Sequence, residues 1–231
     1  MINIKKFYPV IHCVCPYEKG GIGHALANTR IAQQNGADGV FLIGHGLAHD
    51  ALGLIYDHVR KQYPGFWIGI NFLDLPSSAL SEERILRTCP GLDGLWTDAH
   101  SISGEHATLE VFTGVAFKYV NPGQSGPDLD RACQAAVQEG YIPTTSGDKT
   151  GQPPSLEKLM AIRKAVGAHS RSRLAVASGV NAANVRAMTP YADTFLVASS
   201  ITELADGFER FVPSSVQALA REIHLAQWSD L

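Results

Sequence analysis

The run Tyr141–Asp148 (YIPTTSGD), followed by Arg173–Asn181 (RLAVASGVN) and Ala192–Ser200 (ADTFLVASS), decides the fold. Each of the three segments is a short apolar run that ends in a turn of small polar residues, and a helix-like segment follows each one. This order predicts a strand, a loop and a helix, three times in succession. In parallel α/β proteins, ligands bind at the carboxyl ends of the strands, where these small polar residues lie.

Two of these turns have the composition of an anion site. Ser178 and Gly179 follow the second strand, and Asn181 is the expected cap of the helix after it. Ser199 and Ser200 follow the third strand. Backbone N–H groups in such turns bind phosphate, and in an eight-stranded barrel the loops after strands seven and eight are the usual phosphate site. The alternative is that serine and glycine merely form tight turns here.

The whole chain continues this alternation. Eight apolar runs alternate with helix-like segments and lack consistent polar alternation, as expected of strands that are covered on both faces. We therefore predict an α/β fold, a single (β/α)8 TIM barrel over residues 1–231, because closure removes both sheet edges. An open doubly wound sheet would show G-x-G-x-x-G after the first strand, and Gly20, Gly21 and Gly23 lack the third glycine. The expected strands are 8–15, 39–45, 66–73, 94–100, 113–120, 141–145, 173–177 and 195–197, and the expected helices are 24–35, 48–62, one from Ser81, 129–139, 155–166, 182–188 and 208–226.

Composition limits the functional classes. With 231 residues, of which 45% are hydrophobic, the chain can bury a full core. A net charge of −3 without a basic run argues against nucleic acid, and no apolar stretch is long enough for a membrane span, so we expect a soluble, cytoplasmic protein. The cysteines form no CxxC pair and are predicted to be reduced thiols: Cys13, Cys15, Cys89 and Cys133.

The carboxyl-terminal half resembles a known family. The stretches Thr145–Leu159 (TSGDKTGQPPSLEKL), Val176–Val185 (VASGVNAANV) and Ala192–Ser200 are similar to the BtpA family, named for a photosystem I biogenesis protein. Ala198 stands where the family has glycine, and Thr202 where it often has lysine. The resemblance implies a barrel related to the ribulose-phosphate-binding barrels, with a phosphosugar or nucleoside ligand.

Four side chains near predicted strand ends are the candidate catalytic groups. Lys118 lies in the apolar run 115–120, which predicts a buried amine of lowered pKa, suited to a Schiff base, a general base or an anion clamp. His12 and Asp98 are candidate acid/base groups. Asp148 either serves as a base or binds a sugar hydroxyl, or it caps its own loop as an Asx-turn.

The candidate ligand-binding residues lie at the same strand ends: Asn71, Ser146, Ser178, Gly179, Ser199 and Ser200. Trp67 and Trp96 are expected to pack between barrel and helices. The Gly-x-Asp turns that contain Asp38 and Asp93, together with the similarly placed Ala192–Asp193, are expected to be structural elements of the opposite face.

Three functions remain open at this point. The first is an enzyme acting on a small phosphorylated metabolite, as an isomerase, a lyase or a glycosyl-bond enzyme without a cofactor. The second is a non-catalytic, BtpA-like ligand-binding or assembly protein. The third is a metal-dependent hydrolase that uses His12, His45, Asp98 and His100. The amphipathic pattern of residues 213–228 is compatible with closing the barrel and with packing a homo-oligomer.

Overall fold

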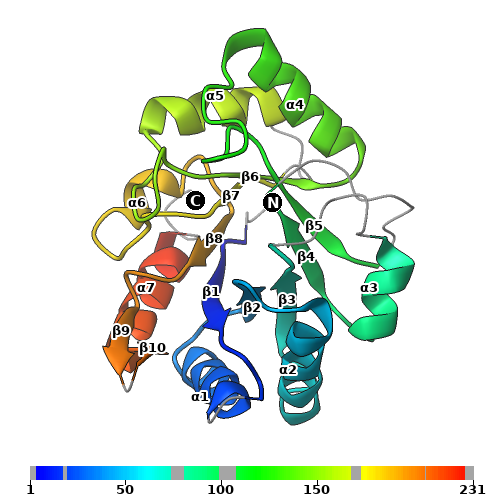
Figure 1. Cartoon of the computed structure of the whole chain (residues 1–231). Helices are drawn as coiled ribbons and strands as arrows, with labels where there is room; N and C mark the ends of the chain where they lie inside the picture. The colour runs from blue at the N-terminus through cyan, green and yellow to red at the C-terminus, as the bar shows by residue number, and fades with distance from the viewer. Residues whose placement is uncertain are drawn as a thin grey trace.

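A computed structural model describes residues 4–17, 20–73, 81–98, 108–167, 173–205 and 207–226. Eight parallel strands form a closed barrel in the order β1 to β8, and helices surround it (Figure 1). The predicted (β/α)8 barrel is confirmed. Its strands are β1 (Lys6–Cys13), β2 (Gly39–Gly44), β3 (Trp67–Asn71), β4 (Gly94–Thr97), β5 (Glu110–Gly114), β6 (Ile142–Thr145), β7 (Ala175–Val176) and β8 (Thr194–Val197). The helices are α1 (Gly21–Gln34), α2 (His49–Gln62), α3 (Glu82–Thr88), α4 (Gly126–Gln138), α5 (Leu156–Val166), α6 (Val185–Met188) and α7 (Pro213–Ala226).

The barrel interior is filled with aromatic rings. Tyr8 stacks on Trp67 with ring centroids 4.1 Å apart, and Phe41 meets Trp67 edge to face at 5.1 Å. Space for these rings comes from glycines in the strands: a Cβ on Gly69 would lie 2.3 Å from the Phe41 ring, and one on Gly94 would lie 2.4 Å from the Trp67 indole. Trp67 and Trp96 therefore pack inside the barrel, in the same cluster as Tyr8 and Phe41. The prediction that these tryptophans lie between the barrel and the helices is wrong.

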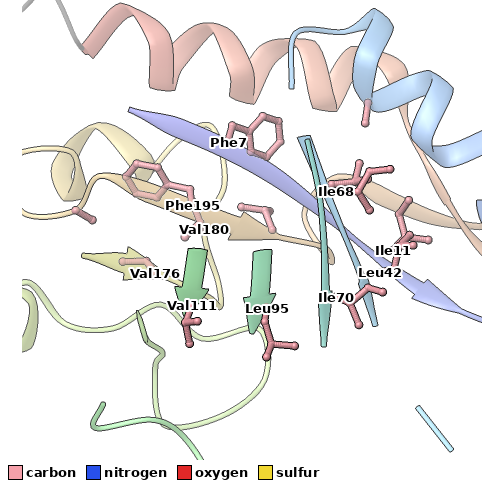
Figure 2. Packing of buried hydrophobic residues seen from close by; sticks show 14 of the residues in the cluster. Phe7, Ile11, Leu42, Ile68, Ile70, Leu95, Val111, Val176, Val180 and Phe195 are labelled. Carbon is pink, nitrogen blue, oxygen red and sulfur yellow. The ribbon is translucent and has the colours of Figure 1, made fainter. Parts of the chain in front are cut away.

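A second apolar layer lies between the strands and the surrounding helices. Alternate strand residues point outward, so Phe7 and Ile11 of β1 belong to this layer while Tyr8 and Val10 point inward. Figure 2 shows part of the outer layer, including Phe7, Ile11 and Phe195. Because every strand is buried on both faces, the strands read as continuous apolar runs in the sequence.

The Gly-x-Asp turns act as anchors on the face opposite the strand carboxyl ends. Asp38 accepts a hydrogen bond from the backbone N–H of Phe7 at 2.9 Å, and Asp93 accepts one from Ile68 at 2.8 Å. Asp193 in the same way accepts from Leu174 N–H at 2.9 Å. Each carboxylate also contacts a basic side chain: Lys6 and His224 at Asp38, Arg60 at Asp93, and Lys5 and Arg163 at Asp193. Their predicted structural role is confirmed.

The strand predicted over 113–120 is wrong in its extent. β5 begins at Glu110 and ends at Gly114, so Lys118 lies in the loop after the strand and not within it. The chain turns because Ala116 and Tyr119 adopt positive φ values of 45° and 67°. Such values are uncommon for residues other than glycine and are incompatible with an extended strand. Val115, Ala116 and Phe117 are nevertheless buried, which gives the start of this loop a strand-like composition.

The helix predicted over 208–226 is also wrong in its first part. An antiparallel hairpin, β9 (Thr202–Ala205) and β10 (Phe208–Phe211), lies between β8 and α7. Only from Pro213 onward does the chain form the amphipathic α7, with Val216, Leu219 and Ile223 buried. Phe208 and Phe211 are three positions apart, and this spacing is also typical of a helix. The sequence pattern therefore does not distinguish the hairpin from the start of a helix.

The structure also bears on two predictions from the sequence, one about membrane spans and one about the cysteines. None of the helices in the described ranges has the length and apolar character that crossing a bilayer would require. The four cysteines are free thiols, and burial raises the pKa of Cys13, Cys89 and Cys133 to about 12. These buried thiols are therefore protonated and unreactive at neutral pH.

Candidate functional site

A cavity of about 280 Å³ opens at the carboxyl ends of the strands. Its floor is formed by interior residues, including Val10, Trp96 and Leu196. Its walls come from the end of β1 and from the loops after β5, β6, β7 and β8. Of the predicted site residues, it brings together His12, Lys118, Ser178, Gly179, Ser199 and Ser200.

The loops after β7 and β8 present unpartnered donors to this cavity. In residues 178–180 and 198–200, the backbone N–H groups donate no hydrogen bond to any described residue. All six of these residues line the cavity. Backbone N–H groups require a partner when they are buried, and an anion can accept from several at once. The two loops therefore offer a set of donors of the kind that binds phosphate.

The helix expected to assist this anion site is much shorter than predicted. α6 begins at Val185, is four residues long and has Asn184 as its cap residue. Asn181 instead holds a turn, because its side-chain oxygen accepts from the N–H groups of Ala183 and Asn184 at 2.9 and 3.1 Å. The prediction that Asn181 opens a helix at the site is thus wrong. The donors available to an anion here are the loop N–H groups and not a helix N-terminus.

Tight loop packing shapes this wall of the cavity. A Cβ on Gly179, where φ is 63°, would lie 2.1 Å from the backbone nitrogen of Pro153, so this position requires glycine. The Ser178 hydroxyl donates to Lys149 O at 3.4 Å, and the Ser200 hydroxyl donates to Val180 O at 2.6 Å. These two serine side chains join neighbouring loops, whereas Ser199 is exposed at the cavity mouth.

Lys118 faces the cavity from the loop after β5. Its amine has no hydrogen bond or ion pair among the described residues, and it lies 5.9 Å from the centre of the Phe117 ring. Burial lowers the pKa of Lys118 below the ordinary lysine value, while Tyr119 and Asp98 act in the opposite direction. The predicted lowering of this pKa is confirmed in direction, although the residue lies in a turn and not in a strand.

A lysine that the sequence did not single out fixes this turn. Lys158 of α5 donates from Nζ to Ala116 O at 2.6 Å and to Ser146 O at 2.8 Å, which joins the loops after β5 and β6. The Lys118 N–H donates to the Ser146 hydroxyl at 2.9 Å. Gln124 accepts from Ala116 N–H at 2.9 Å. Together these bonds hold the positive-φ turn that places Lys118 at the cavity.

Asp98 and Asn71 lie at the ends of β4 and β3, on the inward-facing alternation of their strands. Asp98 Oδ1 and Asn71 Nδ2 are buried without a hydrogen-bond partner in the described part of the chain, as is Trp96 Nε1. Burial raises the pKa of Asp98, and the charge of Lys118 and the nearby Asn71 amide lower it in part. Unpartnered buried polar atoms are costly, so they mark a place where a ligand can bind.

Four predicted site residues do not line the cavity: Asn71 and Asp98 at the strand ends just described, and Ser146 and Asp148. Ser146 is fully buried, and its hydroxyl donates to Gly147 O at 2.9 Å while accepting from Lys118 N–H, so it supports the loop and does not line the cavity. Asp148 is exposed on the loop after β6, outside the cavity lining, where its charge acts on Lys158. Asp148 therefore meets only a ligand that extends beyond the cavity mouth.

The rim histidines do not assemble a metal centre in the described ranges. The rings of His12 and His45 lie 5.3 Å apart, but no group of three or more His, Cys, Asp or Glu side chains in those ranges has the arrangement of a metal site. His100 lies outside the described residues. His12 instead pairs with Glu209 of β10, with Nδ1 and Oε2 2.5 Å apart.

Comparison with known proteins supports the fold. Neither a protein-family model nor a curated protein sequence matches the chain. Among solved structures, one titled "Native KDPGal structure" is 13% identical with a TM-score of 0.68, covering 97% of this chain and 96% of the other. Mycobacterium tuberculosis tryptophan synthase is 13% identical with a TM-score of 0.69, covering 96% and 93%. Phosphoribosylanthranilate isomerase from Thermotoga maritima is 13% identical with a TM-score of 0.60, covering 95% and 98%.

These likenesses place the chain in one architectural class. Over nearly the whole length of each partner, this protein has the fold of the (β/α)8 TIM barrels. Active sites of such barrels lie at the carboxyl ends of the strands, where the cavity described above is found. Fold alone does not determine the chemistry of the site, which depends on the side chains present.

Proposed function

We propose that this protein is a TIM-barrel enzyme that acts on a small phosphorylated metabolite, such as a sugar phosphate or a nucleotide-like compound. One observation carries the proposal: a single cavity combines N–H groups from the loops after β7 and β8 with the amine of Lys118, and none of these donors has a partner among the described residues. A phosphate group can accept hydrogen bonds from several donors and also pair with an ammonium group.

The size of the cavity favours a small ligand. Its volume of about 280 Å³ lies just below the roughly 300–1,000 Å³ that is usual for ligand pockets. A dinucleotide would extend far beyond it. The phosphosugar or nucleoside ligand implied by the BtpA resemblance belongs to the size class that we propose, as does the phosphoribosyl compound in the name of one structural neighbour.

The proposed chemistry uses Lys118, which lines the cavity, and Asp98, whose charge acts on Lys118 from the end of β4. A lysine of lowered pKa is more often in its neutral, nucleophilic form, so Lys118 can form a Schiff base or accept a proton. Burial raises the pKa of Asp98, so this carboxyl group is protonated more often than an ordinary aspartate and can serve as a proton donor or acceptor. These roles suit isomerase, lyase or glycosyl-bond chemistry, with Asn71 orienting a hydroxyl or carbonyl group of the substrate.

Binding is tested with pairs of phosphorylated and unphosphorylated sugars and nucleosides in a thermal-shift assay. A ligand at a hundred times its Kd adds about 2.7 kcal/mol of stability, which corresponds to roughly 5–10 °C in Tm for a domain of this size. Ser199→Asp places a negative charge at the donors and should abolish that shift. Ser214→Asp adds the same charge at an exposed position on α7, outside the cavity lining, and should leave it unchanged.

Equal stabilisation by the unphosphorylated partners, or full binding by Ser199→Asp, would refute the phosphate site. Catalysis is tested separately with Lys118→Met, which should bind the ligand more weakly and, at saturating ligand, lose turnover by about 10²–10⁴-fold, as expected for a catalytic acid–base group. Lys149→Met removes the same charge from an exposed position in the next loop and should retain turnover. Binding of a phosphorylated ligand by the wild-type protein without turnover of that ligand would favour a non-catalytic binding protein.

A further inference from the structure

The hairpin between β8 and α7 brings a carboxylate to the wall of the cavity. Glu209 of β10 lies 197 residues from His12 in the sequence, yet its Oε2 is 2.5 Å from His12 Nδ1. The His12 side chain lines the cavity and is one-third exposed. Its second ring nitrogen, Nε2, has no hydrogen-bond partner among the described residues. This nitrogen is therefore the one available to a ligand.

The backbone of Glu209 is held by two polar side chains of α1. Glu209 O accepts from His24 Nε2 at 2.5 Å and from Asn28 Nδ2 at 3.1 Å. Asn28 is only 1% exposed, and its Oδ1 accepts from Phe211 N–H at 2.7 Å. A buried amide is stabilising only when its hydrogen bonds are satisfied, and these bonds fix the strand on both sides of Arg210.

The hairpin itself is fixed at its base. Val212 N–H donates to Ile201 O at 2.8 Å, and Phe211 is 1% exposed. Alternate residues of a strand share one face, so Glu209 lies on the same face of β10 as the buried Phe211. The Glu209 side chain is thus carried by a rigid strand, and such support is required of a residue that positions a general base.

We infer that Glu209 is a positioning residue that makes His12 the proton acceptor of this cavity. A carboxylate that accepts from Nδ1–H fixes the imidazole in the Nδ1–H tautomer and leaves the lone pair of Nε2 facing the ligand. When Nε2 takes a proton from a C–H or O–H bond of the substrate, a new N–H bond forms and the electron pair of the broken bond stays on the substrate. Glu209 stabilises the imidazolium that results.

This inference rests on the proposed function for its substrate, but the tautomer can be tested without one. In ¹⁵N-labelled protein, long-range ¹H–¹⁵N spectra identify which ring nitrogen of each histidine carries the proton. The signals of His12 are assigned by their loss in His12→Gln. We expect Nδ1 of neutral His12 to be the protonated nitrogen, and Glu209→Gln to shift the population toward Nε2–H, because the amide can donate as well as accept.

Glu203→Gln is the matched control, since Glu203 is an exposed residue of β9 in the same hairpin and pairs with Arg210 in the ladder. It should leave the tautomer unchanged. A wild-type His12 protonated at Nε2, or an unchanged tautomer in Glu209→Gln, would overturn the inference even if phosphorylated ligands bind.

Kinetics provide the second measurement. Once a substrate is identified by the binding screen, Glu209→Gln should lower kcat by about 10²-fold or more, within the range for acid–base catalysis, while KM changes little because the phosphate donors lie on other loops. Glu203→Gln should retain full kcat. A change in KM alone would assign Glu209 to ligand binding and overturn the positioning role. Failure of every phosphorylated ligand to bind would instead refute the proposed function and leave the tautomer result standing.

Discussion

Replacement of Lys158 by methionine tests how the turn that carries Lys118 is held. Lys158 Nζ donates to Ala116 O at 2.6 Å and to Ser146 O at 2.8 Å, and methionine keeps most of the apolar stem while removing both bonds. Hydrogen bonds to charged groups contribute about 1.5–3 kcal/mol each. Burial lowers the pKa of Lys158, with Asp148 opposing, so part of that gain offsets the cost of burying the ammonium group.

The two bonds together therefore give a gross contribution of about 3–6 kcal/mol. Because burying the ammonium group offsets part of this, we expect about 2–3 kcal/mol as the loss in the free energy of unfolding. Ala116 O keeps a second donor, the Thr145 hydroxyl at 3.4 Å, whereas Ser146 O loses its partner. In a domain of this size the loss corresponds to about 4–12 °C in Tm.

The assay is urea unfolding followed by circular dichroism, with Lys164→Met as the control. Lys164 is exposed on the same helix, so its replacement should change the free energy of unfolding by no more than about 0.5 kcal/mol. Ligand affinity of Lys158→Met should also fall, because Lys118 is no longer fixed at the cavity. Stability equal to that of Lys164→Met would refute the reasoning that these two bonds hold the loops together.

Three further predictions follow from individual contacts. Asp98→Asn removes a negative charge that raises the pKa of Lys118, so an amine reagent should begin to modify Lys118 at lower pH. Mass spectrometry maps the modified lysines, and Lys149 should react as in the wild type. An unchanged pH profile for Lys118 would argue against the coupling between Asp98 and Lys118. Gly69→Ala places a Cβ 2.3 Å from the Phe41 ring and should lower the free energy of unfolding in urea by about 1–3 kcal/mol or more. Gly65 has open space around it, so Gly65→Ala should leave the free energy of unfolding nearly unchanged. Equal effects of the two substitutions would contradict the packing argument. Burial by itself raises the pKa of Asp38, but hydrogen bonds from His224, Phe7 N–H and Lys6 outweigh it and lower the pKa. This carboxylate therefore stabilises the fold above its unfolded pKa of about 4, and the stability is lost as pH falls through the folded pKa. Asp38→Asn should be less stable than wild type at pH 7 and approach it in acid, and a constant difference from pH 7 to pH 2 would contradict this linkage.

The barrel and the region of its site were predictable because they depend on local patterns. Apolar runs that end in small polar turns arise wherever a strand is buried on both faces and its carboxyl end meets a ligand, and residues 141–200 show this three times. The inward alternation of strand residues likewise predicts that His12, Asn71 and Asp98 gather at the same end. The Gly-x-Asp turns were recognisable because the acidic residue follows the turn at a constant spacing.

The contacts that complete the site depend on chain geometry and not on residue type. The sequence could not reveal that Ser146 turns inward to support Lys118, or that the apolar run 115–120 bends at Ala116, because a buried loop and a buried strand have the same composition. It gave no sign of the His12–Glu209 contact, which depends on how an entire hairpin docks on α1. Whether an N–H group is free for a ligand follows from the path of its neighbours. The sequence by itself determined the barrel and the end at which ligands bind, whereas the tertiary structure decided which polar groups remain unpartnered there, because hydrogen bonds form between residues that only folding brings together.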